Sequence, residues 1–318
     1  MRILIVKTSS LGDVIHALPV VSDLCRVLPD VSIDWCVEEG FAAIPRLHPG
    51  VQRVIPVALR RWRKKPLSLS TWREIAAARR DLRAESYDCV LDLQGLLKSA
   101  LIADQANGPI SGYAAAAARE PAAARYYTHS FLIPKNAHAV ERNRWLAAAA
   151  LDLPLEQPLD YGVNAAPAVA EWLPPKPYVV LLTATSRDDK LWPEADWVAL
   201  GAALHERGLA AVLPAGHAGE RQRAERLAAA MPDAVVAPPL AIDALAAVLA
   251  GSVGAIGVDT GLTHLAAALA RPTVAIYTAT DPGLTGVLGS GPFRNLGGQN
   301  AAPDVGAVLA AFDACRRG

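Results

Sequence analysis

Short runs of β-branched and apolar residues alternate along the chain with longer segments in which apolar positions recur at helical spacing. In the first half this pattern predicts strands at residues 2–7, 32–37 and 88–93, and helices at residues 14–28 and 140–151. Strands that alternate with helices in this way are typical of a parallel sheet covered by helices.

A stretch rich in proline and alanine, residues 160–177, interrupts the pattern and predicts a linker between two domains. A chain of 318 residues also exceeds the size at which one hydrophobic core usually stops growing, which favours two α/β halves. Beyond the linker the alternation restarts and predicts a second doubly wound half, with strands at residues 178–183, 209–214, 234–236, 255–258 and 273–277.

The last apolar residues of the chain fall at helical spacing and predict a closing amphipathic helix: Val305, Val308, Leu309, Phe312 and Cys315. We expect one domain over residues 1–165 and a second over residues 178–300. The terminal helix, within residues 301–318, is expected to pack back towards the first domain.

Charge in the chain is balanced. Lys and Arg together number 31, as do Asp and Glu, so no overall field attracts nucleic acid. The four cysteines lack zinc spacing and suit a reducing compartment. No stretch approaches the roughly 20 apolar residues that span a bilayer, and the opening apolar run is short for a signal peptide. We expect a cytoplasmic protein that meets a membrane only at its surface.

A polar segment, residues 7–13 (KTSSLGD), links the first predicted strand to the first helix. Ligands of open α/β sheets bind beyond the carboxyl ends of the strands, where helix N-termini present free N–H groups. Gly12 allows the backbone to approach a ligand closely. Asp13 is either a helix cap, a common role for aspartate, or a catalytic carboxylate. Ser9 or Ser10 can take the capping role and leave Asp13 free to accept a proton from an acceptor hydroxyl.

A second segment of this kind, residues 257–264 (GVDTGLTH), joins a predicted strand to an alanine-rich helix. Thr260 and Gly261 would offer backbone N–H groups to a diphosphate. Asp259 would either accept hydrogen bonds from sugar hydroxyls or cap the helix, and His264 would either reach the same anion or pack internally. Asp-Thr-Gly also occurs in aspartic proteases, but those enzymes need two carboxylates on a β-rich scaffold, so a hydrolase is disfavoured.

Two further segments carry cations. In the loop at residues 183–193 (TATSRDDKLWP), Lys190 would neutralise a diphosphate, with Thr185 and Ser186 bonding its oxygens, unless this is an ordinary polar loop. The cluster at residues 60–65 (RRWRKK) is followed by leucines and a second tryptophan. It is either a solvated face or a surface for the carboxylates and phosphates of a lipid-linked acceptor, resting at the headgroup level.

Several common motifs are absent from the sequence. There is no G-x-G-x-x-G after either opening strand and no P-loop, which disfavours an NAD-dependent oxidoreductase. There is also no D-x-D triplet of the kind that holds a metal ion on a sugar nucleotide. A transferase built from these parts would offset the charge of the leaving group with Lys190 and helix N-termini, without a metal.

Taken together, these segments resemble the lipopolysaccharide heptosyltransferase I family, within glycosyltransferase family 9. The similarity rests on the opening RILIVKTSSLGDVIHALP, the segment VEEGFAAIP, the cluster RRWRKK, the loop TSRDDKLWP and the turn GVDTGLTHLAAALARPTVAIY. It extends from the first residue to about Gly283. The resemblance implies a GT-B fold, two facing Rossmann-like domains with the reaction in the cleft between them. It also implies inverting, metal-independent transfer of L-glycero-D-manno-heptose from ADP-heptose to the first Kdo of Kdo2-lipid A.

The resemblance further implies roles for individual residues. Asp13 would be the general base that activates the Kdo hydroxyl, and Glu220 would take the ribose hydroxyls of the donor. The residues implied around ADP-heptose are Thr185, Ser186, Lys190, Glu220, Leu240, Asp259, Thr260, Gly261 and His264. The residues implied on the acceptor side are Ser10, Gly12, Arg60, Arg61, Arg63 and Lys64. No cofactor is implied, and the enzyme would work on the cytoplasmic face of the inner membrane.

The sequence departs from the family pattern at a few positions. Ser186 stands where threonine is common, which keeps the hydroxyl, and Leu240 stands where methionine is usual, which keeps an apolar contact for adenine. The turn at residues 278–282 and the alanine-rich stretch at residues 114–124 differ more. Two alternatives remain open: a heptosyltransferase II that adds the second heptose, and a non-catalytic nucleotide-sugar binding protein.

Overall fold

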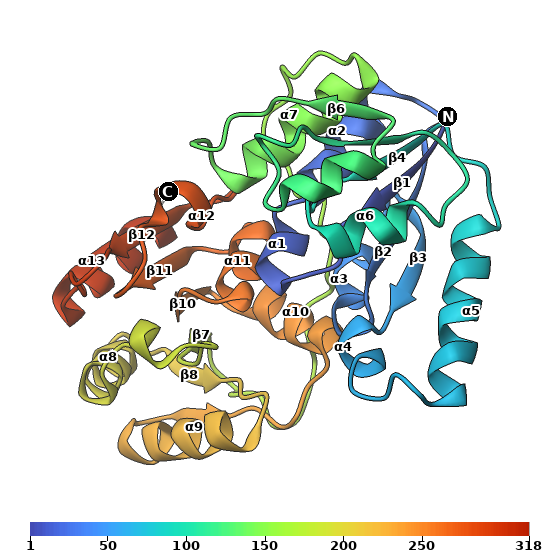
Figure 1. Ribbon diagram of the computed structural model, residues 1–318. Coiled ribbons are helices and arrows are strands. Elements are labelled where there is room, and N and C mark those ends of the chain that lie inside the picture. Colours follow the sequence, from blue (N-terminus) through green and yellow to red (C-terminus); the bar gives the residue numbers. More distant parts are fainter. Residues whose placement is uncertain (318) are drawn as a thin grey trace. The chain divides into compact units, whose positions relative to one another are not determined.

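The apolar runs of the sequence form the strands of two separate parallel sheets in the computed structural model, which describes residues 1–317 (Figure 1). The chain divides into two compact units, Met1–Val163 and a second that begins at Asn164. Residues 153–177 contain no helix or strand, and the division between the units falls within this segment.

The first sheet has the strand order β3-β2-β1-β4-β5-β6, and all its neighbouring strands run parallel. At its centre, Ile5 lies opposite Trp35 on one side and Leu91 on the other. The sequence predicted three of the strands and missed β3, β5 and β6, which are short or carry polar residues. The strands are β1 (Arg2–Val6), β2 (Ser32–Glu38), β3 (Val51–Val57), β4 (Cys89–Asp92), β5 (Ile110–Tyr113) and β6 (His129–Phe131).

Consecutive side chains of β1 point to opposite faces of this sheet, and Ile3–Val6 are all fully buried. Both faces of the sheet are therefore covered, and helices cover them. Leu4 and Val6 pack in one cluster with residues of α5 and α6, while α2 and α7 pack against each other. The helices are α1 (Leu11–Ile15), α2 (Leu18–Val27), α3 (Ala43–Arg46), α4 (Leu59–Trp62), α5 (Leu69–Arg83), α6 (Leu97–Ala103) and α7 (Ala139–Leu151).

The single helix predicted at residues 14–28 is wrong, because the structure has two helices there, α1 and α2. Pro19 lies in the first turn of α2, where its missing N–H costs nothing. In the interior of a continuous helix the same proline would remove a hydrogen bond and clash with the preceding turn. The chain therefore ends α1 at Ile15 and starts again at Leu18.

The second sheet repeats the topology of the first, with the order β12-β11-β10-β7-β8-β9 and parallel neighbours throughout. All five strands predicted for this half are present, and the sixth, β12, was not predicted. The strands are β7 (Tyr178–Leu182), β8 (Ala210–Leu213), β9 (Ala234–Val236), β10 (Gly254–Val258), β11 (Thr273–Tyr277) and β12 (Phe293–Gly297).

A large apolar core lies between one face of the second sheet and α8, α9 and α13. On the other face, Ala267 of α11 packs with Ala275 and Tyr277 of β11. The helices of this unit are α8 (Glu194–Glu206), α9 (Ala218–Ala230), α10 (Ile242–Gly251), α11 (Gly261–Ala268), α12 (Pro282–Thr285) and α13 (Val305–Arg317).

The closing helix α13 packs on the second sheet. The expectation that it packs back towards the first domain stays a prediction. The buried α13 residues Val308, Phe312 and Cys315 belong to the core of the second unit, and the helix contacts β11, β12 and α8. A Cβ atom on Gly254 would lie 2.6 Å from the Phe312 ring, so the glycine allows the ring to rest on the start of β10. The apolar face of α13 is thus buried next to β12, the strand that precedes this helix in the chain.

Replacing Phe312 with alanine should destabilise the protein by about 3–5 kcal/mol, because the ring is fully buried and its loss leaves a cavity. The measurement is urea or thermal unfolding of the full chain. Arg317→Ala, an exposed change on the same helix, is the matched control and should leave stability within about 0.5 kcal/mol. A Phe312→Ala variant as stable as the control would contradict the packing of α13.

Candidate active site

In each sheet the strand order reverses between two central strands, β1 and β4 in the first and β7 and β10 in the second. Ligands of doubly wound sheets bind beyond the carboxyl ends of the strands at such a switch point. The four segments that follow these strands contain most of the residues selected from the sequence. Asp13 follows β1, Lys190 follows β7, and Asp259 follows β10 directly.

Asp13 lies in the first turn of α1, and each of its carboxylate oxygens has a partner. The backbone N–H and the hydroxyl of Ser10 donate to Oδ2 at 3.0 and 3.1 Å. The guanidinium of Arg119 lies 2.8 Å from Oδ1. The sequence expectation that a serine would cap the helix and leave Asp13 free is therefore corrected: Ser10 is the N-cap residue, and Asp13 bonds back to it.

The charge of Asp13 is set by opposing effects. Burial alone would raise the pKa of this carboxyl, but the positive charges of Lys7 and Arg119 outweigh burial and lower the pKa to about 2. Asp13 is therefore an ionised carboxylate at neutral pH, able to accept a proton. Its side chain is 17% exposed, so a ligand can reach it.

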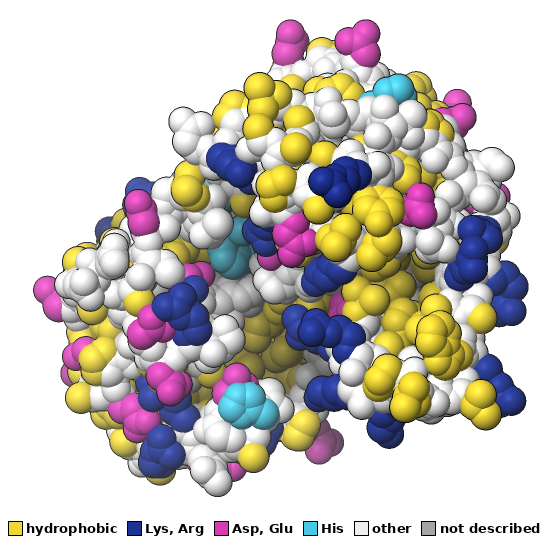
Figure 2. All heavy atoms as spheres, in the orientation of Figure 1, with side chains coloured by type: hydrophobic (Ala, Val, Ile, Leu, Met, Phe, Trp, Pro, Cys, Tyr) yellow, Lys and Arg dark blue, Asp and Glu magenta, His cyan; other side chains and the backbone are white. Residues whose placement is uncertain are grey.

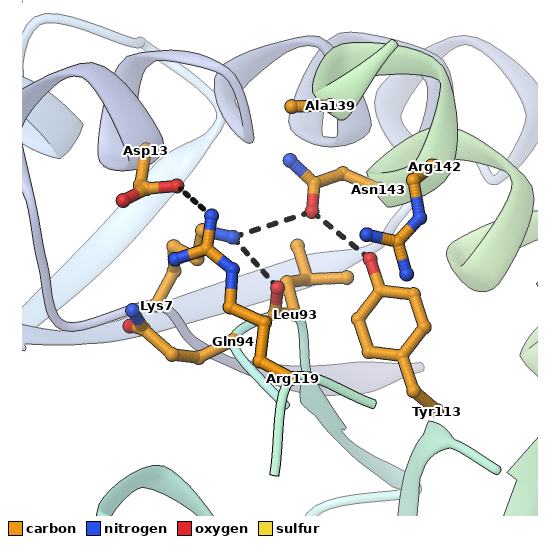
Figure 3. Close-up of a pocket in the computed structure, with 9 residues that line it drawn as sticks. All are labelled: Lys7, Asp13, Leu93, Gln94, Tyr113, Arg119, Ala139, Arg142 and Asn143. Atoms are coloured by element: carbon orange, nitrogen blue, oxygen red, sulfur yellow. Dashed lines mark hydrogen bonds and ion pairs between the residues drawn. The ribbon is translucent and has the colours of Figure 1, made fainter. Parts of the chain in front are cut away.

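A polar pocket opens beside Asp13 (Figure 3). The ammonium of Lys7 lies at its base and donates to the carbonyl of Leu93 at 2.7 Å and to Oδ1 of Asn143 at 3.4 Å. Burial lowers the pKa of Lys7 to about 8, against the opposing charge of Asp13. With Arg119 and Arg142 the pocket holds three cationic side chains and one carboxylate. Its lining residues are Lys7, Asp13, Leu93, Gln94, Tyr113, Arg119, Ala139, Arg142 and Asn143.

The loop that leads to Asp13 is held by Gln94, which follows β4. The side-chain oxygen of Gln94 accepts from the backbone N–H groups of Thr8 and Ser9 at 2.8 and 3.2 Å, and its amide nitrogen donates to the Ser9 carbonyl. The Gln94 backbone in turn donates to the buried carboxylate of Asp92 at 2.8 Å. These bonds join the loops after β1 and β4 at the switch point.

In the second unit, Asp259 is the centre of a charged cluster. The ammonium of Lys190 lies 2.6 Å from its Oδ2, and the hydroxyl of Thr280 donates to the same oxygen at 2.9 Å. The ring of His264 lies 3.9 Å from Oδ1. Burial alone would raise the pKa of Asp259. The hydrogen bonds from His264 and Lys190 outweigh that effect and lower the pKa far below its usual range.

The structure brings together several of the predicted donor residues around this cluster. The Thr185 hydroxyl donates to the Asp259 carbonyl at 3.0 Å. Thr260 precedes α11 and Gly261 is its first residue, so their N–H groups belong to the free N-terminus of that helix. Ser186 is exposed in the loop after β7.

Glu220 and Leu240 lie on other loops of the second unit. Glu220 follows β8, and its Oε2 accepts from the backbone N–H of Gly216 at 2.7 Å and that of His217 at 3.4 Å. One carboxylate oxygen thus caps α9, a role that sequence analysis did not consider. Leu240 is half-buried in the connection between β9 and α10.

The predicted acceptor residues Arg60–Lys64 follow β3, at the edge of the first sheet, whereas Ser10 and Gly12 lie beside Asp13. Arg60, Arg63 and Lys64 are exposed. Arg61 forms ion pairs with Glu39 at 3.0 Å and with Glu74 at 2.8 Å. Its charge is therefore already balanced within the protein.

Sequence reasoning missed most of the pocket around Asp13. Gln94 was detectable, because it directly follows a predicted central strand, the same signal that selected residues 7–13. Arg119 and Arg142 carry no local signal: one lies in an alanine-rich stretch and the other in an ordinary helix. Only the tertiary fold brings Arg119, 106 positions away in sequence, to Asp13.

Comparison with known proteins decides the family. A sequence model of glycosyltransferase family 9 (heptosyltransferase) matches residues 75–308. The chain belongs to glycosyltransferase family 9. This heptosyltransferase is 48% identical to lipopolysaccharide heptosyltransferase 1 of Pseudomonas aeruginosa. The match of 294 residues covers 91% of this chain and 82% of that protein. It is 44% identical over 317 residues to lipopolysaccharide heptosyltransferase 1 of Salmonella typhimurium, over 97% of this chain and all of that one.

Solved structures agree with this assignment. The heptosyltransferase superposes on E. coli heptosyltransferase WaaC with ADP at a TM-score of 0.91 and 42% identity, over 99% of this chain and 100% of that one. WaaC with ADP-2-deoxy-2-fluoro heptose gives a TM-score of 0.88 and 40% identity, over 99% of both chains. The family resemblance and the GT-B fold predicted from the sequence are confirmed.

Two structural features are absent from residues 1–317 of this heptosyltransferase. No helix in that range is both long and apolar enough to cross a bilayer. No group of three or more His, Cys, Asp or Glu side chains within the same range is arranged to hold a metal ion.

Proposed function

We propose that this heptosyltransferase moves L-glycero-D-manno-heptose from ADP-heptose to the first Kdo of Kdo2-lipid A, with inversion and without a metal. The relatives named lipopolysaccharide heptosyltransferase 1 and the WaaC structure with a fluorinated ADP-heptose support this choice of donor and product. The site residues support the chemistry, and the pocket beside Asp13 supports the acceptor.

In the proposed reaction Asp13 is the general base. An acceptor hydroxyl attacks the anomeric carbon of heptose, its proton passes to the Asp13 carboxylate, and the bond from that carbon to the β-phosphate oxygen breaks. ADP leaves with the electron pair of the broken bond. A single displacement of this kind inverts the anomeric configuration. The low pKa of Asp13 keeps the carboxylate unprotonated at neutral pH when the acceptor binds, although it also makes Asp13 a weak base.

On the donor side, the departing ADP gains negative charge that must be stabilised. Lys190 supplies a point charge, and the free N–H groups at the start of α11 supply hydrogen bonds and a partial positive charge. Asp259 holds Lys190 in place, and its second oxygen, beside the His264 ring, can also accept from heptose hydroxyls. These groups take the role that a divalent metal has in other sugar transferases, so chelation with EDTA should leave turnover unchanged.

The observation that carries the acceptor assignment is the excess of positive charge around Asp13. Lys7, Arg119 and Arg142 line the pocket against one carboxylate, which favours an anionic ligand. Kdo is an acidic sugar whose carboxylate suits the planar guanidinium groups. Asp13 balances one of the three cations, and a neutral sugar acceptor would leave the other two without a counter-charge in the pocket.

The direct test is mass spectrometry of Kdo2-lipid A after incubation with the enzyme and ADP-heptose in EDTA. We expect one added heptose. Kdo2-lipid A that already carries one heptose serves as the second acceptor, and exclusive modification of that substrate would make the protein a heptosyltransferase II. Binding of ADP-heptose with no transfer to either acceptor would contradict catalysis and leave a nucleotide-sugar binding protein.

The pKa of Lys7 predicts how acceptor binding depends on pH. Its pKa is lowered from 10.5 to about 8, so the ammonium loses its proton as the pH rises through about 8. If Lys7 binds the acceptor carboxylate, the KM for Kdo2-lipid A should rise above that pH while the KM for ADP-heptose stays constant. Steady-state kinetics between pH 6.5 and pH 9.5 would measure both constants.

Lys7→Met should raise the acceptor KM about 10-fold or more at neutral pH and abolish its pH dependence, because a charged hydrogen bond is lost. Lys98→Met is the matched control. Lys98 donates to the Ser9 hydroxyl at 2.8 Å in the loop that leads to Asp13, and its loss leaves Lys7 in place. An unchanged pH dependence in Lys7→Met would show that another group titrates.

We also propose that the enzyme works at the cytoplasmic face of the inner membrane, as a peripheral protein. The lipid anchor of the proposed acceptor requires contact with a bilayer.

A further inference from the structure

The segment between β3 and α5 presents large apolar side chains to solvent. Leu67 is 94% exposed, Leu69 77% and Trp72 59%. Single exposed hydrophobic residues are common in proteins, but three within six positions form a patch that marks an interaction site. Among residues 1–317, Trp72 is also the one tryptophan in the exposed class.

Exposed cations surround this patch. Arg60, Arg63, Lys64 and Lys65 come just before it, and Arg73 follows Trp72 on α5. Within the part of the chain that the structure describes, no ion pair involves any of these five side chains. Figure 2 shows hydrophobic and Lys or Arg side chains gathered together over α4 and α5. The charge of the patch is therefore positive. Apart from Arg60, whose guanidinium lies over the Phe41 ring, these cations are available to an external partner.

The base of the segment is fixed, although its tip is exposed. The indole of Trp62 donates to Oε2 of Glu74 at 2.7 Å, and Arg61 pairs with the same carboxylate at 2.8 Å. Arg61 also pairs with Glu39, which follows β2. These bonds join α4 to α5 and to the sheet, so the exposed apolar residues of the segment extend from a fixed base.

We propose that residues 60–73 form a docking surface for an anionic lipid bilayer. In this surface Leu67, Leu69 and Trp72 enter the boundary between headgroups and acyl chains, where indole rings favour the interface. Arg63, Lys64 and Lys65 pair with the lipid phosphates above them. The uniform positive charge around the apolar tip is what selects a bilayer over a protein partner.

The position of the surface fits the acceptor that we propose, and this step rests on the proposed function. The segment follows the carboxyl end of β3, and Asp13 follows the carboxyl end of β1, so both lie at the same edge of the first sheet. Only β2 separates the two strands, which puts them roughly 10 Å apart. A glycolipid held in a bilayer at residues 60–73 would have its sugars within reach of Asp13.

Vesicle sedimentation tests the proposal without any acceptor. The protein should bind vesicles of phosphatidylcholine with phosphatidylglycerol, more weakly at high salt, and bind pure phosphatidylcholine poorly. The triple variant Leu67→Ser, Leu69→Ser, Trp72→Ser should bind at least 10-fold more weakly, with its melting temperature unchanged because the three side chains are exposed. The control is Val169→Ser, a fully exposed apolar residue of the second unit, and it should bind like wild type. Equal binding of the triple variant and wild type would overturn the proposal.

Fluorescence gives a second measurement on the same residues. Brominated phosphatidylglycerol vesicles should quench part of the tryptophan emission, and Trp72→Phe should remove most of that quenching. Quenching that persists fully in Trp72→Phe would contradict insertion at this point.

Turnover separates this proposal from the proposed function. The triple variant should act like wild type on acceptor dispersed in detergent and be slower on acceptor in vesicles. Equal rates on vesicles would overturn the docking role. If the wild-type enzyme transfers no heptose to dispersed acceptor, the proposed function is wrong. Vesicle binding would still test the docking surface independently of that result.

Discussion

Replacing Asp13 with alanine is expected to lower the turnover of heptose transfer by roughly 10²–10⁴-fold, the usual effect of losing a general base. The reason is that no other carboxylate lines the pocket around Asp13 in the described part of the chain. The affinity for ADP should persist, because the residues that we propose for ADP lie in the second unit. Steady-state kinetics and ADP titration by calorimetry measure the two quantities.

Alanine alone would not separate catalysis from structure, because Asp13 also bonds to the N-cap residue Ser10. Losing that contact should cost about 1 kcal/mol of stability. Asp13→Asn is the matched variant. Its amide oxygen can still accept from Ser10, so the variant should melt close to wild type, yet it cannot take a proton and should lose as much turnover as Asp13→Ala. Wild-type turnover in Asp13→Asn would remove Asp13 from the mechanism.

The sequence predicted the fold well where local pattern and tertiary environment agree. The central strands β1, β4, β7 and β10 are buried on both faces, so they appear as unbroken apolar runs. Edge strands such as β3 and β12 are partly exposed and carry polar residues, so their sequences resemble loops. The break between α1 and α2 was missed because the helical pattern of apolar residues continues through Pro19.

The catalytic candidates were predictable for a related reason. Asp13, Lys190 and Asp259 lie in segments that follow central strands, so the position of the strand also gives the position of the site. Arg119 and Arg142 come from segments near the far edge of the first sheet, and only side-chain length and packing bring them to Asp13. The partners of a site residue therefore require the tertiary structure, even where the residue itself does not.

Each unit has one charged side chain at its switch point that is paired with side chains of opposite sign, and the sign of the central charge differs between the units. In the first, a carboxylate is surrounded by the cations Lys7 and Arg119, which keep it ionised. In the second, a lysine is held by a carboxylate, and Asp259 is bonded further by Thr280. In the mechanism that we propose, one switch point supplies a base, and the other supplies a cation for the leaving group. This division of charge would allow a chain of balanced total charge to bind the two anionic substrates that we propose.

Replacing Lys190 with methionine is expected to lower kcat by roughly 10²–10³-fold, the usual effect of losing one group that stabilises transition-state charge. In the ligand-free protein Lys190 is paired with Asp259 at 2.6 Å, and both side chains are mostly buried. The variant leaves Asp259 without its cation, so the pKa of that carboxyl should rise. The affinity for ADP should weaken as well, since the ammonium no longer attracts the diphosphate.

Two further variants make this prediction specific. Lys190→Arg keeps the charge and should recover part of the lost kcat. Arg187→Met removes an equal charge from the same loop, where Arg187 is exposed and pairs with Asp189, and it should leave kcat within about 3-fold of wild type. If Arg187→Met and Lys190→Met lower kcat equally, the effect comes from the general field of the loop, and Lys190 has no specific role in stabilising the departing ADP.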